Sequence, residues 1–170
     1  TDLPDQALGF RVQLYGMTKH RDLFTPRQLV ALTTFSDLVG EARERIRQDA
    51  VAAGLPGDGV ADDGTADGAR PLRDGGRGAR AYAEAVSVYL AFALSRWTDY
   101  ANTITTWNST NQNMRNAFAR QALPMTWDFA ESNLFGPKLS FDVACEWITP
   151  VIEQSTDQVA GVVVQRDAAA

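Results

Sequence analysis

The segment RQALPMTWDFAESN, residues 120–133, gathers the side chains of this sequence that are best suited to chemistry. Asp128 and Glu131 stand three residues apart, a spacing that puts two carboxylates on one face of a helix. Such a pair can transfer protons or bind a metal ion, but it can also pair with arginines. Arg115 and Arg120 stand close by in the sequence. A catalytic carboxylate pair is therefore weighed against a salt-bridged structural corner.

The proline in the middle of this segment favours the structural corner. Pro124 ends one helix and can begin the next, and the apolar side chains around it are expected to lock the turn. Trp127 would be the buried anchor, and the polar neighbours would satisfy one another. The predicted bracket consists of Arg120, Gln121, Trp127, Asp128 and Glu131. Large aromatic residues usually pack in cores, and we expect the same of Trp107 and Trp147.

The remaining reactive side chains do not form a recognisable catalytic set. His20 lies in the polar run MTKHRD without an elbow-type serine motif, and Cys145 in FDVACEW is interpreted as a buried thiol on a helix. One Cys and one His cannot build a Cys/His zinc site. The glycines of residues 55–78 do not follow a strand, as a phosphate-binding loop requires. We predict no catalytic residue and no metal ligand.

The charge balance disfavours a free-standing nucleic-acid binder. The 170 residues carry a formal net charge of −5, whereas phosphate binding usually calls for a basic surplus. A local basic cluster is still present near the start of the first long helix. Trp107 is the aromatic residue of a polar segment on which a base could stack. The candidate DNA contacts are Lys19, Arg21, Arg27, Arg115 and Trp107.

Two long helices dominate the predicted architecture. Residues 25–54 have apolar positions at helical spacing, with Thr25 as N-cap, Pro26 in the first turn, and Gly54 and Pro56 at the end. Residues 78–103 are apolar on nearly all sides, which predicts a central, buried helix. Between them, residues 55–77 form a long Gly/Asp-rich surface loop.

Shorter elements are predicted around this pair. Residues 9–15 alternate like a half-buried strand, and residues 161–165 read as a second strand. Helices are expected over 112–123 and 124–133, and a third after Ser140, kinked or split at Pro150. The fold class is therefore mainly α, a single helical domain or fragment over 1–170 with four to five helices and two short flanking strands. These strands pair with each other or belong to an incomplete Rossmann-like sheet.

Three stretches are distinctive: GFRVQLYGMTKHRDLFTPRQLVAL (9–32), GARAYAEAVSVYLAFALSR (78–96) and NAFARQALPMTWDFAESN (116–133). In this order they resemble the large adenine-specific DNA methylases of bacteria, enzymes linked to restriction–modification and phage defence. The family has a variable insertion between the first two stretches, which residues 55–77 would represent. Its E-x-N-P-F ending has Leu134 in place of the proline here.

The resemblance implies methyl transfer from S-adenosylmethionine to the exocyclic amine of adenine. That reaction needs a Gly-rich cofactor loop after a strand, and an Asp/Asn-Pro-Pro-aromatic loop that binds the flipped-out base. The seven prolines of this chain are never adjacent, and no glycine pair follows a predicted strand. We therefore expect a segment that is inactive alone, binds no cofactor itself, and braces the catalytic core or shapes its DNA-facing side. Asp167 would resemble the acidic residue near the cofactor's adenine, and Arg166 stands where such motifs often carry glycine.

The implied partners are the remainder of the methylase polypeptide and, through the full-length enzyme, DNA. A second hypothesis is a self-sufficient helical protein-interaction module, which the acidic net charge and the two strands without partners favour. No apolar run approaches the ~20 residues that a membrane span needs, and a signal-peptide pattern is missing from these residues. With a single cysteine, the expected setting is the reducing cytoplasm.

Overall fold

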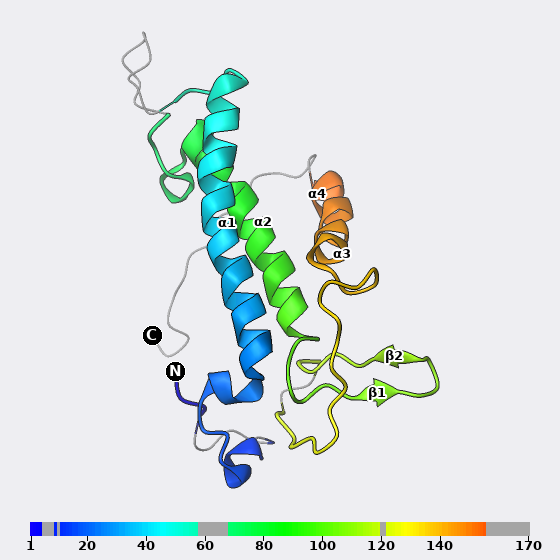
Figure 1. Cartoon of the computed structure of the whole chain (residues 1–170). Helices are drawn as coiled ribbons and strands as arrows, with labels where there is room; N and C mark the ends of the chain where they lie inside the picture. Colours follow the sequence, from blue (N-terminus) through cyan, green and yellow to red (C-terminus); the bar gives the residue numbers. More distant parts are fainter. Residues whose placement is uncertain (5–8, 10, 58–67, 120–121, 156–170) are drawn as a thin grey trace.

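The computed structural model describes residues 1–4, 9, 11–57, 68–119 and 122–155. As predicted, the described chain is mainly helical, and it also contains a small antiparallel sheet. Figure 1 shows two long helices side by side, a short helical pair next to the second of them, and a hairpin at one end. The elements are η1 (Val12–Tyr15), η2 (His20–Leu23), α1 (Pro26–Ala52), η3 (Leu72–Asp74), α2 (Ala79–Thr98), β1 (Trp107–Asn108), β2 (Asn113–Met114), α3 (Phe141–Glu146) and α4 (Thr149–Ser155).

Helix α1 begins and ends as its sequence predicts. The Thr25 hydroxyl accepts a hydrogen bond from the Gln28 N–H, and the Gln28 side chain accepts one from the Thr25 N–H at 2.8 Å. This reciprocal capping, together with Pro26 in the first turn, fixes the start of the helix. After the helix, Gly54 adopts a φ of 97°, which glycine allows at little cost.

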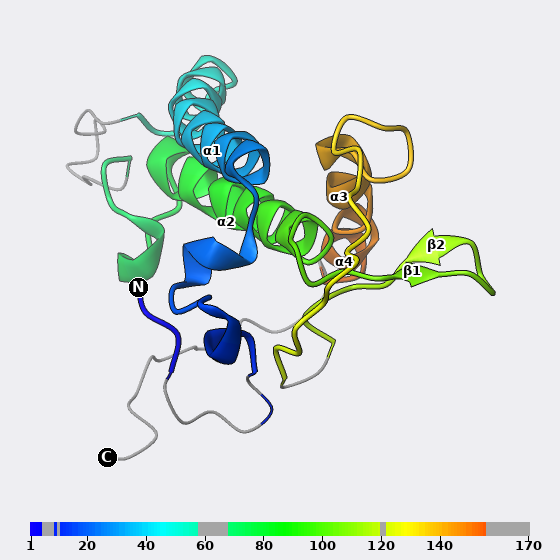
Figure 2. The ribbon, with the colours of Figure 1, turned by 60° about the horizontal axis from the view of Figure 1, so that its bottom comes forward.

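Helix α2 packs against α1 and is buried along only part of its surface (Figures 1 and 2). Its small residues Ala79, Ala83 and Ala93 are buried, which allows the two backbones to approach closely. Tyr82 and Phe92, in contrast, are 52% and 58% exposed. The prediction of a helix buried on nearly all sides is therefore wrong, because no other described element covers this flank of α2.

Trp97, near the end of α2, anchors the main hydrophobic cluster. Its side chain is 2% exposed, and its indole N–H donates to the Leu139 carbonyl at 2.6 Å. The rings of Phe35 and Phe141 lie at 4.7 Å and 6.0 Å from it, in edge-on contact. Trp97 thus joins α1, α2 and the start of α3 in one core.

The N-terminal segment forms turns instead of the strand predicted over 9–15. Val12 is fully buried, yet Leu14 is 80% exposed, so the expected alternation fails. The N–H of Gly16 bonds to the Gln13 carbonyl and that of Met17 to the Val12 carbonyl, so the backbone is satisfied locally in η1. A second hydrophobic cluster results, made of Leu3, Val12, Leu23, Ile104 and Leu123.

The polar segment after α2 forms a β-hairpin where a helix was predicted from Gln112. Trp107 pairs with Met114, and Asn108 with Asn113. The Asn108 side chain accepts from the N–H groups of Thr110 and Asn111, and Gln112 adopts a φ of 49°. Asn side chains stabilise such turns by bonding to nearby backbone groups. That local bonding outweighs the helical preference of the residues that follow.

The helix predicted over 124–133 is also wrong, because this stretch is irregular and bonds to distant backbone. The Ala130 N–H donates to the Thr105 carbonyl at 3.0 Å, and the Thr105 hydroxyl donates to the Ala130 carbonyl at 2.7 Å. The Ser132 hydroxyl donates to the Tyr100 carbonyl. Because these polar groups bond to residues far away in the sequence, they do not need the hydrogen bonds of a helix.

The cap and the split of the C-terminal helical stretch are confirmed, but the expected burial of Trp147 is wrong, because its side chain is 63% exposed. The Ser140 hydroxyl accepts from the Val143 N–H and caps α3. The helical stretch is then split, with α3 ending at Glu146 and α4 beginning at Thr149, directly before Pro150. The predicted strand over 161–165 and Asp167 lie outside the described residues.

The described parts of the 55–77 segment are held against α2. The Ala79 N–H donates to the Pro56 carbonyl, and the Leu72 N–H donates to the Glu84 carboxylate at 2.7 Å. That second bond lowers the pKa of Glu84. Figure 1 places this segment at the end of the helix pair opposite to the hairpin. Among the described helices, none is long and apolar enough to cross a membrane.

The contrast between two tryptophans yields a stability prediction. Trp97→Ala should lower the free energy of unfolding by about 3–5 kcal/mol, because it empties a large buried site and orphans the Leu139 carbonyl. Trp127→Ala should cost at most about 1 kcal/mol, because Trp127 is 75% exposed and meets the Tyr15 ring edge-on at 4.9 Å. Denaturant titration of both variants measures this, and equal losses would contradict the placement of the core.

Candidate functional site

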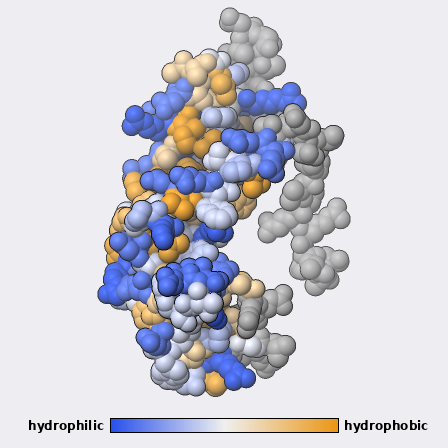
Figure 3. All heavy atoms as spheres, turned by 90° about the vertical axis from the view of Figure 1, so that its right-hand side faces the viewer, coloured by the Kyte–Doolittle hydropathy of each residue, from blue (hydrophilic) through white to orange (hydrophobic). Residues whose placement is uncertain are grey.

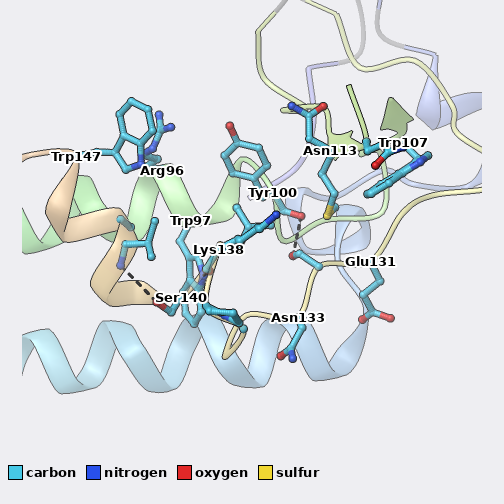
Figure 4. A pocket seen from close by; sticks show the side chains of 18 of the residues that line it. Arg96, Trp97, Tyr100, Trp107, Asn113, Glu131, Asn133, Lys138, Ser140 and Trp147 are labelled. Carbon is cyan, nitrogen blue, oxygen red and sulfur yellow. Dashed lines mark hydrogen bonds between the residues drawn. The ribbon is translucent and has the colours of Figure 1, made fainter. Parts of the chain in front are cut away.

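A groove of about 650 Å³ lies between the end of α2, the β1–β2 hairpin and the stretch that leads into α3. Figure 4 shows Arg96 and Trp147 at one end, Trp107 and Asn113 at the other, and Tyr100 and Lys138 between them. Its other lining residues include Asn111, Met114, Asn133 and Ser140. Aromatic rings, amides and two cations are thus brought together from four separate parts of the chain.

The buried side chain of Asn102 positions the hairpin wall of the groove. It is fully buried just after α2, and its amide donates to the carbonyls of Thr98 and Asp99 at 2.9 Å and 3.2 Å. The Thr98 carbonyl is in the last turn of the helix, where carbonyls lack partners within the helix, and the Asp99 carbonyl also accepts from the Ala117 N–H at 3.0 Å. The amide oxygen accepts from the Ile104 N–H at 3.0 Å. Asn102 therefore ends the helix and fixes the direction in which the chain enters the hairpin.

The hairpin places Trp107 at the groove, and buried residues and backbone hydrogen bonds next to the hairpin hold it there. Ile104 and Thr105 are buried, and the Arg115 N–H donates to the Thr106 carbonyl at 2.9 Å beneath the strands. Trp107 itself is 56% exposed. A large ring that is held by its backbone but open to solvent is available for stacking.

The two cations of the groove lack acidic partners among the described residues. The Arg96 guanidinium lies 4.6 Å from the centre of the Trp147 ring and 5.9 Å from that of Tyr100. Such cation–π contacts orient the guanidinium without neutralising it. Lys138 is exposed and follows Pro137 at the rim. A carboxylate that pairs with either side chain is not found in the described part of the chain.

Glu131 is the one acidic residue among the described residues that line the groove, and Arg27 neutralises it. Arg27 donates to both carboxylate oxygens, from Nε at 2.5 Å and from Nη2. The hydrogen bond and the positive charge lower the pKa of Glu131, so it stays ionised and is a poor proton donor. The groove is therefore locally positive although the whole chain carries −5.

The predicted bracket around Pro124 takes a different form. Glu131 pairs with Arg27, a residue from the first helix that we expected to contact DNA. Trp127 is exposed and is not a buried anchor, and Asp128 is also exposed. Arg120 and Gln121 lie outside the described residues. The carboxylate pair of the sequence is therefore split, with one member in an ion pair and the other at the surface.

The predicted DNA contacts are not gathered at one place. Lys19 and Arg21 belong to the η2 region, where Arg21 lies 3.9 Å from the Asp22 carboxylate. Arg115 follows β2 and is exposed, but it does not line the groove. Of the five candidates, only Trp107 is part of the groove wall.

Three groove residues carry no sequence signal that singles them out. Arg96 sits inside an apolar helical pattern, Lys138 follows a Gly-Pro turn, and Tyr100 looks like one more core aromatic. The available clue is SRWTDY, residues 95–100, in which one cation stands close to two aromatic residues. Cations among aromatic residues are typical of stacking surfaces, but only the fold places Arg96 and Tyr100 in one groove with Trp107.

The arrangement is suited to binding rather than to proton transfer. The Ser132 and Ser140 hydroxyls are engaged in structural bonds. Cys145 is half-buried, and burial together with the Asp142 charge raises the pKa of its thiol. His20 contacts Thr1 through Nδ1, in the N-terminal region. In the described chain, no group of three or more His, Cys, Asp or Glu side chains is placed to hold a metal ion.

Comparisons with protein-family models, curated proteins and solved structures found no match for this chain. The function proposed below rests on the groove, on the contacts that build it and on the sequence resemblance.

The Arg27–Glu131 pair predicts a pH-dependent stability difference. Because the pKa of Glu131 is lowered in the folded state, the pair stabilises the protein above the ordinary value of 4.5 and loses this effect as pH falls through the lowered value. At pH 7, Glu131→Gln should cost about 1 kcal/mol or less, since the pair is partly exposed. The cost should shrink as pH falls through the lowered pKa of Glu131.

Thermal unfolding of both proteins between pH 7 and pH 3 measures this difference. Glu41→Gln, at an exposed position of α1, is the matched control and should leave the melting temperature nearly unchanged at every pH. A melting-temperature gap between wild type and Glu131→Gln that stays constant across the range would contradict the assignment.

Proposed function

We propose that this chain is a non-catalytic helical segment of an S-adenosylmethionine-dependent, adenine-specific DNA methyltransferase, and that it shapes the DNA-facing side of that enzyme. The observation that carries the proposal is the groove, in which Arg96 and Lys138 stand beside the half-buried ring of Tyr100 and the exposed ring of Trp107, without acidic partners among the described residues. Cations with aromatic rings between them are the usual means of holding nucleic acid.

The three stretches that resemble the methylases all contribute to this region. The second stretch ends at Arg96, and the third contains Glu131, Ser132 and Asn133, which line the groove. The first supplies Arg27, which binds Glu131. The described residues of the 55–77 insertion lie at the opposite end of the helix pair (Figure 1). Each of the three stretches thus contributes at least one residue to the groove lining or to the ion pair beside it, which supports a shared role for these residues.

In this proposal the reactive parts belong to the rest of the methylase polypeptide. The Gly-rich turn that holds S-adenosylmethionine and the Asp/Asn-Pro-Pro-aromatic loop would lie there, and this chain would brace them and guide DNA toward them. The enzyme would act in the cytoplasm, in restriction–modification or phage defence. Asp167 is kept as a proposed contact to the cofactor's adenine.

The proposal predicts that the 170-residue chain alone transfers no methyl group. Incubation with DNA and radiolabelled S-adenosylmethionine should leave the DNA unlabelled, because the side chains that position donor and acceptor are missing. The reading frame that encodes the chain should also encode an Asp/Asn-Pro-Pro-aromatic sequence. Methyl transfer by the isolated chain would contradict the proposal, as would a complete reading frame without that sequence.

An alternative function is a self-sufficient protein-interaction module. Large apolar side chains of α2, of α4 and of the turn between α3 and α4 are exposed, among them Phe92, Val151 and Trp147 at 58%, 60% and 63%. Figure 3 shows hydrophobic atoms at the surface on the side that carries α3, α4 and the hairpin. Such surfaces often bind protein. Failure to bind DNA at low salt, combined with tight binding of a protein through Phe92, would favour this alternative.

A further inference from the structure

We propose that the groove binds an unpaired stretch of DNA, with bases stacked on Trp107 and Tyr100 and phosphates held by Arg96 and Lys138. The inference deepens the proposed function and rests on it only for the choice of DNA as the nucleic acid. The choice of a single strand rests on the groove itself.

The aromatic rings of the groove require bases whose faces are free. In a duplex, each base face is covered by its neighbours, so a protein ring can stack only on a base that is unpaired or has been turned out of the helix. Trp107 and Tyr100 reach the groove from different elements, the hairpin and the end of α2 (Figure 4). A duplex would meet the rim of this hollow, whereas a flexible single strand can enter it.

The volume of the groove also favours a single strand over a duplex. About 650 Å³ falls in the range of roughly 300–1,000 Å³ that sites for small ligands occupy. That volume accommodates the planar groups of a strand but not the cross-section of a double helix.

The cations are arranged for phosphate rather than for carboxylate side chains of the same chain. Arg96 is held over the Trp147 ring, so its planar donors are oriented before a ligand arrives. Lys138 lies between the two aromatic ends, as a flexible point charge (Figure 4). Among the described residues that line the groove, Glu131 is the only acid, and Arg27 neutralises it, so a strand would meet the positive charges of Arg96 and Lys138.

The amides give the groove polar contacts for base edges. Asn111, Asn113 and Asn133 line it, and each amide group can both donate and accept. The Asn133 amide oxygen already accepts from the Phe135 N–H, which fixes that side chain and leaves its amide N–H groups for a ligand. Amides read base edges without adding charge, so they suit a site that tolerates several bases.

Fluorescence anisotropy of a labelled oligo-dT strand, titrated with the whole chain, tests the inference. Binding should saturate at low salt and should be tighter than for a duplex of equal length. Trp107→Leu should weaken it by roughly fivefold to a hundredfold, the range expected for losing one stacked base. Lys138→Gln should lower the slope of log affinity against log salt by about 0.7, one phosphate contact on a single strand.

Each groove variant has a matched control elsewhere on the chain. Trp127→Leu replaces a more exposed tryptophan, and Arg45→Gln replaces an exposed cation of α1 that is not among the candidate DNA contacts. Both should bind the strand like the wild type. Trp107→Phe keeps an aromatic face and should restore most of the affinity, which separates stacking from a general effect on the hairpin.

Several results would overturn the inference. They are the absence of saturable binding at low salt, tighter binding of the duplex, and equal losses for Trp107→Leu and Trp127→Leu. Binding of free dAMP as tight as that of the strand would show a nucleotide pocket instead. Tighter binding of the corresponding RNA would overturn the choice of DNA.

This experiment can fail separately from the proposed function. Groove-dependent strand binding in a protein whose reading frame lacks the Asp/Asn-Pro-Pro-aromatic sequence would remove the methylase and keep the strand site. A reading frame that encodes the Asp/Asn-Pro-Pro-aromatic sequence, together with a chain that binds no single strand, would keep the methylase and remove the strand site.

Discussion

The buried amide of Asn102 is the interaction on which the candidate site depends most. One side chain accepts the Ile104 N–H and donates to two carbonyls of the last turn of α2. Unpaired polar groups inside a protein cost about 1–3 kcal/mol each, so this set of bonds strongly favours one exit path for the chain. That path places Thr105 against Ala130, and it places the hairpin beside the end of α2.

The molecule thus divides into a helical support and an irregular, hydrogen-bonded site. The α1–α2 pair is joined to α3 through Trp97 and its aromatic neighbours, which supplies the apolar burial. The site is built largely from turns and extended segments whose polar groups bond to each other over long sequence distances. Loops on a rigid support are a common way to present binding residues, and here they present aromatic rings, amides and two cations.

The parts that the sequence predicts well are those governed by local signals. Thr25, Pro26 and Gln28 define the start of α1, and Ser140 and Pro150 define the start and the split of the α3–α4 stretch. These residues act on backbone groups within one turn, so their effect can be read without the rest of the fold.

The predictions that fail depend on contacts between distant residues. The segment 124–133 has helical spacing, yet its backbone bonds to residues 100–105. Trp97 and Trp127 are alike in sequence context, and only packing makes one a core anchor and leaves the other exposed. Arg27 and Glu131 meet across more than a hundred residues. The role of groove residues such as Arg96 and Lys138 cannot be predicted from their sequence neighbours, because it depends on the residues that the fold places opposite them.

Amide hydrogen exchange in an Asn102→Ala variant tests this account most directly. The amides of Ile104, Arg115 and Ala130 should together lose about tenfold or more of their protection, because they lie on the path that Asn102 fixes. Amides in the middle of α1 should exchange as in the wild type. Unchanged protection at Ile104, Arg115 and Ala130, or an equal loss throughout α1, would contradict the claim that this side chain organises the groove.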